Sequence, residues 1–154
     1  MDMKLAYFID TSASYQEMIR QQMLQLGFEV RSFISVNDYL RATEKKPDLI
    51  LLSQQLKNNE KGIDYLRQVQ HKNKNVPVVM LSNEGDVYTG AEALKMGAMD
   101  YIEKNGAVLV RLRTAIDNIP AFIKREKRKK LLRWLVLVVV IALIGLALLM
   151  SGTI

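Results

Sequence analysis

The sequence predicts an α/β fold: a doubly wound parallel sheet of five strands, a (βα)5 arrangement, followed by one C-terminal transmembrane helix. Three observations support this prediction. Leu49–Leu52 and Val76–Leu81 are continuous apolar runs bounded by turn residues, as is typical of strands buried on both faces. Strand-like and helix-like segments alternate over residues 1–119, which favours a parallel sheet with helices on both sides. Leu135–Met150 contains no charged or polar side chain.

The expected strands are short and rich in aliphatic and aromatic residues. The second strand alternates apolar and polar residues, whereas the third and fourth are apolar throughout. They are expected at Lys4–Ile9, Phe28–Phe33, Leu49–Leu52, Val76–Leu81 and Tyr101–Glu103.

Helices are expected between these strands. In the first, Ser14 and Glu17 form a capping-box pattern, and Gly27 ends the helix. Its apolar residues recur at helical spacing, at Met18, Ile19, Met23 and Leu26. Ser35 is expected to cap a second helix that runs to about Lys45. The remaining helices are expected at 63–72, 86–96 and 107–119.

The chain is expected to contain three parts: a sheet domain at 1–119, a basic juxtamembrane helix at 120–133 and a transmembrane helix at 134–154. Pro120 marks the first boundary, because proline is tolerated in the first turn of a helix but not in its interior. The formal net charge is +6, and one block accounts for all of it. Apart from Glu126, this block contains Lys124, Arg125, Lys127, Arg128, Lys129, Lys130 and Arg133. Such a local block predicts contact with anionic lipid through 124–154 and no binding to nucleic acid.

The apolar tail is long enough to cross a bilayer. At about 1.5 Å per residue, residues 135–154 would span the roughly 30 Å hydrocarbon core. Because the positive charge precedes the span, we expect a tail-anchored protein with the sheet domain in the cytoplasm. A buried core helix is the alternative, and the small residues Ala142, Gly145 and Ala147 leave a homo-oligomer open. The residues expected at the membrane interface are Lys127, Arg128, Lys129, Lys130, Arg133 and Trp134.

The composition argues against a conventional enzyme. The sequence contains no cysteine, so disulfides and thiolate metal sites are excluded. Its single histidine, His71, argues against a histidine-based metal site or a Ser-His-Asp triad. We also find no nucleophile elbow and no phosphate-binding loop. We therefore do not expect a conventional enzyme.

Polar residues follow the expected strands at the edge where a parallel sheet carries its functional crevice. They are Asp10, Thr11, Ser53, Ser82 and Lys104. Together with the segments YFIDTSASYQEMI, PDLILLS, VPVVMLS and GAMDYIEKN, in this order, they resemble the receiver domain of bacterial response regulators over about residues 3–119. The resemblance implies a flavodoxin-like receiver fold and a place in two-component phosphorelay signalling.

In that family, two acids at the end of the first strand hold Mg²⁺, and an aspartate at the end of the third strand accepts the phosphoryl group. By this resemblance Asp10 is the first acid, Thr11 replaces the second and Ser53 replaces the acceptor aspartate. In the family, a hydroxyl after the fourth strand and a lysine after the fifth bind the phosphoryl group. Here these residues are Ser82 and Lys104.

The resemblance also implies a switch aromatic, Tyr101, which in the family rotates with activation. It further implies that the surface of about Asp86–Ile119 binds a protein partner or a second copy of the chain.

The substitutions in the crevice predict a degenerate site with no metal and no cofactor. One carboxylate in place of three should bind Mg²⁺ poorly. A serine hydroxyl is a weak nucleophile unless a base activates it. We therefore expect a pseudo-receiver that acts without phosphorylation. Two alternatives remain: an active phosphorelay component with an atypical acceptor, which Glu84 or Asp86 could assist, and a structural subunit of a membrane complex.

Overall fold

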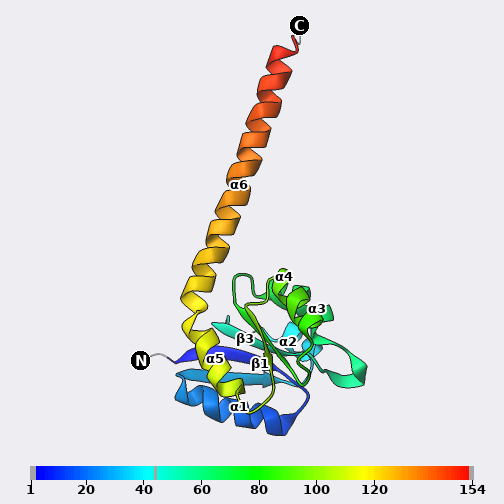
Figure 1. The fold of residues 1–154 in the computed structure, drawn as a ribbon, viewed down its shortest axis with the longest axis vertical. Coiled ribbons are helices and arrows are strands. Elements are labelled where there is room, and N and C mark those ends of the chain that lie inside the picture. The colour runs from blue at the N-terminus through cyan, green and yellow to red at the C-terminus, as the bar shows by residue number, and fades with distance from the viewer. Residues whose placement is uncertain (1–2, 44, 153–154) are drawn as a thin grey trace. The chain divides into compact units, whose positions relative to one another are not determined.

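The computed structural model describes residues 3–43 and 45–152. Its strands form one parallel five-stranded sheet in the order β2-β1-β3-β4-β5 (Figure 1). The strands are β1 Lys4–Ile9, β2 Phe28–Phe33, β3 Leu49–Ser53, β4 Val78–Ser82 and β5 Asp100–Glu103. The predicted doubly wound parallel sheet is therefore confirmed.

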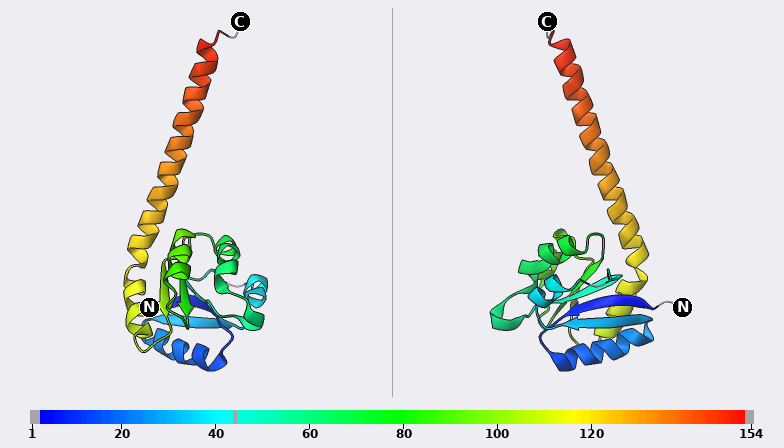
Figure 2. Two further views of the ribbon diagram at one scale, coloured as in Figure 1. Left: turned by 45° about the vertical axis from the view of Figure 1, so that its right-hand side comes forward. Right: turned by 180° about the vertical axis from the view of Figure 1, so that it is seen from behind.

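Helices cover both faces of the sheet (Figure 2). The helices of the sheet domain are α1 Ala13–Gln25, α2 Val36–Arg41, α3 Gly62–Lys72, α4 Val87–Lys95 and α5 Val108–Asp117, with a 3₁₀ turn, η1, at Lys57–Asn59. One apolar cluster joins the sheet to α1 and α5, and a second joins it to α2, α3 and α4. Every residue of β3 and β4 is buried, because both strands lie inside the sheet with helices on each side.

The strand order sets the position of the site. β1 lies between β2 and β3, so the connection after β1 leads to one side of the sheet and the connection after β2 leads back to the other. The crevice of such a sheet lies at this switch point, beyond the carboxyl ends of β1 and β3. Those ends carry Asp10 and Ser53.

The prediction that Ser14 and Glu17 form a capping box at the start of the first helix is wrong. The N-cap is Ser12, whose side chain accepts a hydrogen bond from the backbone N–H of Tyr15. Glu17 instead forms an exposed ion pair with Arg20, at 2.7 Å between Oε1 and Nη2. The helix begins two residues early because Asp10 accepts the N–H of Ser12 and holds the turn before it.

Several other element boundaries differ from the expected ones by one or more residues, most clearly those of α2 and β4. α2 ends at Arg41 rather than near Lys45, and position 44 lies outside the described residues. Its end is capped from α3, because the Lys72 ammonium donates to the carbonyls of Tyr39, Leu40 and Ala42. β4 begins at Val78 rather than at Val76, because the Val76 N–H bonds to Asn73 in a turn.

The chain divides into two compact units between Ile119 and Pro120. The helix α6, Ile119–Met150, begins at this boundary and makes up most of the second unit. It contains both the basic block and the apolar tail up to Met150. Within the described part of the chain, α6 is the one helix long and apolar enough to cross a membrane, and none of its apolar window is buried. Residues 153 and 154, the end of the expected span, lie outside the described residues.

Candidate functional site at the carboxyl edge of the sheet

Four of the residues named from the sequence meet at this edge. Asp10 follows β1, Ser53 and Ser82 end β3 and β4, and Lys104 follows β5. Asp10, Ser53 and Ser82 are almost completely buried. Backbone hydrogen bonds to neighbouring strands hold Asp10 and Lys104 in register. The Asp10 N–H donates to the Phe33 carbonyl at 3.0 Å, and the Lys104 N–H donates to the Ser82 carbonyl at 2.7 Å. The sheet therefore presents these side chains to one small crevice.

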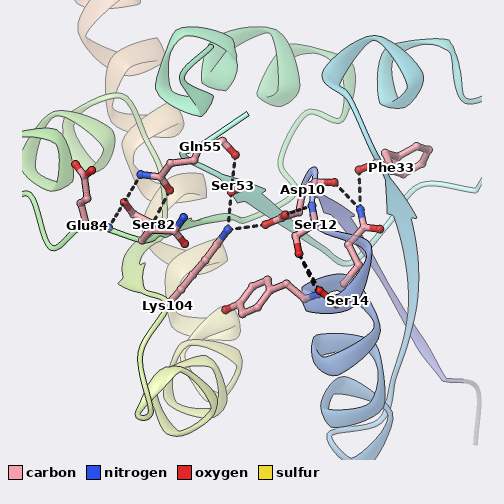
Figure 3. Close-up of polar contacts among 12 residues, drawn as sticks. Asp10, Ser12, Ser14, Phe33, Ser53, Gln55, Ser82, Glu84 and Lys104 are labelled. Carbon is pink, nitrogen blue, oxygen red and sulfur yellow. Dashed lines mark hydrogen bonds and ion pairs between the residues drawn. The ribbon is translucent and has the colours of Figure 1, made fainter. Parts of the chain in front are cut away.

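The Lys104 ammonium lies at the centre of this crevice (Figure 3). Its Nζ is 2.6 Å from Asp10 Oδ2 and 2.8 Å from Ser53 Oγ. The ion pair is buried, with 8% of the Lys104 side chain and 2% of the Asp10 side chain exposed. The ammonium also lies 4.7 Å from the centroid of the Tyr15 ring. Lys104 thus neutralises Asp10, the one buried carboxylate among the described residues.

Asp10 uses both carboxylate oxygens within the protein. Oδ2 accepts from Lys104, and Oδ1 accepts the backbone N–H of Ser12 at 2.7 Å. Thr11, the residue between them, is partly buried and takes no part in the hydrogen bonds described at this edge. Burial raises the pKa of Tyr15 to about 12, and the negative charge of Asp10 contributes a smaller part of this rise.

Ser53 is held by the loop that follows it. Its hydroxyl donates to the carbonyl of Gln55 at 3.0 Å, and the Gly62 N–H donates to the carbonyl of Gln54 at 2.8 Å. Gly62 must lack a side chain, because a Cβ there would lie 2.0 Å from the Ser53 carbonyl oxygen. Ser53 is thus both a donor to the loop and an acceptor from Lys104.

Gln55 is the main residue of the site that the sequence did not reveal. Its Nε2 donates to Ser82 Oγ at 3.2 Å, and its Oε1 accepts the Asn83 N–H at 2.9 Å (Figure 3). The Glu84 N–H also donates to Ser82 Oγ, at 3.1 Å. The one signal for Gln55 in the sequence was its position two residues after Ser53. That position alone does not predict the direction of the Gln55 side chain.

Tyr101 on β5 lies beside Ser82. Burial raises the pKa of Tyr101, and the neighbouring Ser82 side chain lowers it by less. Gly90 on α4 leaves room for the ring, since a Cβ there would lie 3.2 Å from Tyr101 Cδ1. A cleft of about 360 Å³ opens next to these groups, lined by residues that include Gln55, Glu84 and Tyr101.

The donor set does not fit Mg²⁺. That cation takes hard oxygen ligands, commonly carboxylates. Among the four side chains that meet here, Asp10 alone is a carboxylate, and both of its oxygens are already engaged. Among residues 3–43 and 45–152, no three His, Asp or Glu side chains lie together as potential metal ligands. We therefore derive no chemistry through a metal here.

The carboxylates that could have assisted Ser53 have other roles or lie in the solvent. Asp86 is the N-cap of α4 and accepts from the Tyr88 N–H and the Thr89 hydroxyl. Its pKa is lowered, chiefly by the bond from Thr89. Glu84 contributes its backbone N–H to Ser82 and is an exposed residue.

The residues expected at a membrane interface lie on α6. Lys127, Arg128, Lys129 and Lys130 are exposed, as are Arg133 and Trp134 one turn further on. Lys129 pairs with Glu126 at 2.9 Å. The rest of the block is positive and leads directly into the apolar part of the helix.

Comparison with known proteins identifies related sequences and folds. Residues 7–117 match the family model described as the response regulator receiver domain. The chain is 29% identical over 111 residues to the regulatory protein LuxO of Vibrio cholerae. This aligned region covers 71% of this chain and 24% of LuxO. It is 26% identical over 98 residues to the transcriptional regulatory protein TdiR of Thauera aromatica, covering 64% of this chain and 43% of TdiR.

Solved structures share the fold. NtrX from Brucella abortus superimposes with a TM-score of 0.71 at 23% identity, over 85% of this chain and 30% of that one. The BeF3-activated receiver domain of DrrB superimposes with a TM-score of 0.63 at 20% identity, over 75% of this chain and 98% of that one. The chain spans about a quarter of the length of the LuxO proteins that it matches.

Proposed function

The chain belongs to the family of response regulator receiver domains, and from this premise we propose that it is a membrane-tethered pseudo-receiver that binds a protein partner without being phosphorylated. It would act in two-component-like signalling through binding rather than catalysis. The observation that carries this proposal is the buried Lys104 ammonium, bonded to both Asp10 and Ser53.

The chemistry of Ser53 supports this reading. Acyl-phosphate formation in receivers uses a carboxylate, and position 53 offers a hydroxyl. That hydroxyl is buried and donates to the Gln55 carbonyl, while its oxygen accepts from Lys104. A nearby ammonium donor makes the oxygen less nucleophilic, and a serine needs an adjacent base to react. The crevice therefore favours a fixed polar cluster over a phosphoryl acceptor.

The expected partner surface supports a binding role. Within the face of about Asp86–Ile119, Val87 is 80% exposed and Tyr88 is 88% exposed at the start of α4. Leu94 and Val110 add further exposed aliphatic side chains. Large apolar groups that are accessible together are a common feature of protein interaction sites. We propose that a protein partner or a second copy of the chain binds here.

The charge distribution along α6 supports a membrane anchor. In a helix that lies on a membrane, apolar and basic residues occupy opposite sides of the axis. In α6 they follow one another along the axis instead, since 124–133 is basic and 135–150 is apolar. We propose that α6 crosses the bacterial inner membrane with its basic segment at the cytoplasmic headgroups. The sheet domain would then stay at the cytoplasmic surface, close to membrane-bound partners.

Incubation of the full chain with a small phosphodonor and Mg²⁺ tests the proposal. We expect no mass gain on the wild-type chain. The variant with Thr11→Asp and Ser53→Asp restores the family's acids and serves as the positive control. A gain of one phosphoryl group at Ser53 would contradict the pseudo-receiver and favour an active phosphorelay component. Co-purification from native membranes would then identify the partner.

A further inference from the structure

We propose that Asn105 is a site of spontaneous deamidation, in which its side-chain amide is replaced by a carboxyl group at the rim of the crevice. Asn105 and Gly106 directly follow Lys104, and they form the one Asn-Gly dipeptide in the sequence. Both residues are exposed, so water reaches them. The reaction does not depend on whether Ser53 accepts a phosphoryl group.

The Gly106 backbone nitrogen is accessible as the nucleophile. Among residues 3–43 and 45–152, no carbonyl or side chain accepts a hydrogen bond from the Gly106 N–H. A Cβ at Gly106 would meet nothing within 4 Å, so the space around this residue is open. After Asn83, by contrast, the next N–H is held, because Glu84 donates to Ser82 Oγ at 3.1 Å. The structure therefore favours reaction at Asn105 over Asn83.

Two hydrogen bonds orient the Asn105 amide. Its Oδ1 accepts the Ala107 N–H at 2.9 Å, and its Nδ2 donates to Glu103 Oε2 at 3.2 Å. A backbone N–H is only a donor and an ionised carboxylate only an acceptor, so the amide oxygen must face Ala107. An N–H at that oxygen stabilises the negative charge that develops there when Cγ is attacked. The fold therefore supplies an oxyanion donor at the reacting group.

The reaction consumes water alone. Water or hydroxide takes the proton of the Gly106 N–H, and the nitrogen attacks Asn105 Cγ to close a succinimide ring. The Cγ–Nδ2 bond breaks, and the side-chain nitrogen leaves as ammonia after it takes a proton from water. A water molecule then opens the ring at either carbonyl and gives aspartate or isoaspartate at position 105. In sum, one amide and one water become one carboxyl group and one ammonia.

The product changes the charge at the rim of the crevice. A carboxylate at position 105 would face the Glu103 carboxylate where an amide now donates, and like charges repel. Glu103 lies against the loop between β4 and α4, because a Cβ at Gly85 would lie 3.1 Å from Glu103 Oε2. The same loop supplies the Glu84 N–H to Ser82. Deamidation is therefore a slow, one-way change that loosens this side of the crevice.

Peptide mass spectrometry of the full chain, incubated in detergent micelles at neutral pH, tests the inference. Cleavage after arginine gives the peptide 68–111, which contains both Asn105 and Asn83. We expect the mass gain of an amide-to-carboxyl change to grow at Asn105 and not at Asn83. Gly106→Ala should slow the gain severalfold, because its methyl group hinders the attack while the fold has room for it. No gain at Asn105, an equal gain at Asn83 or an unchanged rate in Gly106→Ala would overturn the inference.

The effect on the crevice is tested with Asn105→Asp, which introduces the product directly. Glu103→Gln removes the facing charge and serves as the second background. We expect Asn105→Asp to lower the urea midpoint more in the wild-type background than in Glu103→Gln, since the difference isolates the repulsion. Equal shifts in the two backgrounds would overturn the proposed loosening. Phosphorylation of Ser53 would leave both measurements interpretable, so this inference and the pseudo-receiver fail separately.

Discussion

Asp10 and Lys104 lie 94 positions apart in the chain, and their side chains form a buried ion pair with 2.6 Å between Oδ2 and Nζ. The pair connects the first and last strands of the domain across the crevice. A buried charge is tolerated when it is paired and hydrogen-bonded, and both conditions hold for Asp10. The same contact occupies Oδ2, the Asp10 oxygen that lies nearest to Lys104 in the crevice.

Removing the ammonium should destabilise the domain. Lys104→Met leaves the Asp10 carboxylate buried and unpaired, and breaking a buried pair in this way costs about 3–5 kcal/mol. Adding Asp10→Asn should restore part of the loss, because the buried charge disappears. The free energy of unfolding is measured in urea from the near-ultraviolet circular dichroism of the tyrosines, since Trp134 lies on α6 and does not report on the sheet.

The matched control for Lys104→Met is an exposed ion pair. Arg111 and Asp100 lie 3.4 Å apart, with about half of the Arg111 side chain exposed. Arg111→Met should change the free energy of unfolding by less than about 1 kcal/mol. Equal effects of Lys104→Met and Arg111→Met would show that the buried pair has no special role.

Gly62→Ala should disrupt the loop after Ser53. The new Cβ would lie 2.0 Å from the Ser53 carbonyl oxygen, so the backbone of β3 or α3 must move. Such overpacking typically costs about 1–3 kcal/mol and sometimes more. Gly106→Ala is the control, because a Cβ at Gly106 meets nothing within 4 Å. In urea, the free energy of unfolding should fall strongly for Gly62→Ala and change little for Gly106→Ala. Similar unfolding midpoints for the two variants would contradict the described packing.

Tyr15 should make the stability of the domain depend on alkaline pH. Its pKa is raised from 10.0 to about 12, first by burial and second by Asp10. The unfolded chain therefore releases this proton at lower pH than the folded chain does. The contribution of Tyr15 to the free energy of unfolding is therefore fully present below about pH 10 and is lost as the pH rises toward 12. Tyr15→Phe should fall less steeply in unfolding free energy over this window. Parallel curves for wild type and variant would refute the assignment.

The anchor is tested by extracting membranes with alkaline carbonate. The full chain should remain in the pellet if α6 crosses the bilayer as proposed, because the span needs about 30 Å of apolar helix. The double substitution Val139→Arg and Leu143→Arg should release it, because each arginine at the centre of a span costs about 2.5–3.5 kcal/mol. Val139→Ala with Leu143→Ala is the control and should stay in the pellet. Release of the wild-type chain would contradict the proposed topology.

The sequence predicted the sheet because its signals are local. The apolar runs at β3 and β4 and the glycine after α1 and α4 do not depend on distant residues, and Gly27 and Gly97 indeed adopt positive φ. The prediction of element boundaries was less accurate where a side chain far away in the sequence determines where an element ends. α2 ends early because Lys72, from another helix, caps its carbonyls.

The same distinction explains what was predictable in the site. The ends of parallel strands meet at one edge, so Asp10, Ser53, Ser82 and Lys104 could be named from their order in the chain. Gln55 could not, because its role depends on the direction of one side chain toward Ser82 and Asn83, 27 and 28 residues further along. No periodicity in the sequence encodes that direction.

The binding of beryllofluoride with Mg²⁺, followed by fluorine NMR on the full chain, tests the central proposal most directly. Beryllofluoride mimics a phosphoryl group but needs a carboxylate acceptor and a bound cation. We predict no bound fluoride resonance for the wild-type chain and a bound resonance for the Thr11→Asp, Ser53→Asp variant. Bound beryllofluoride on the wild-type chain, with Ser53 and Lys104 unchanged, would contradict the account.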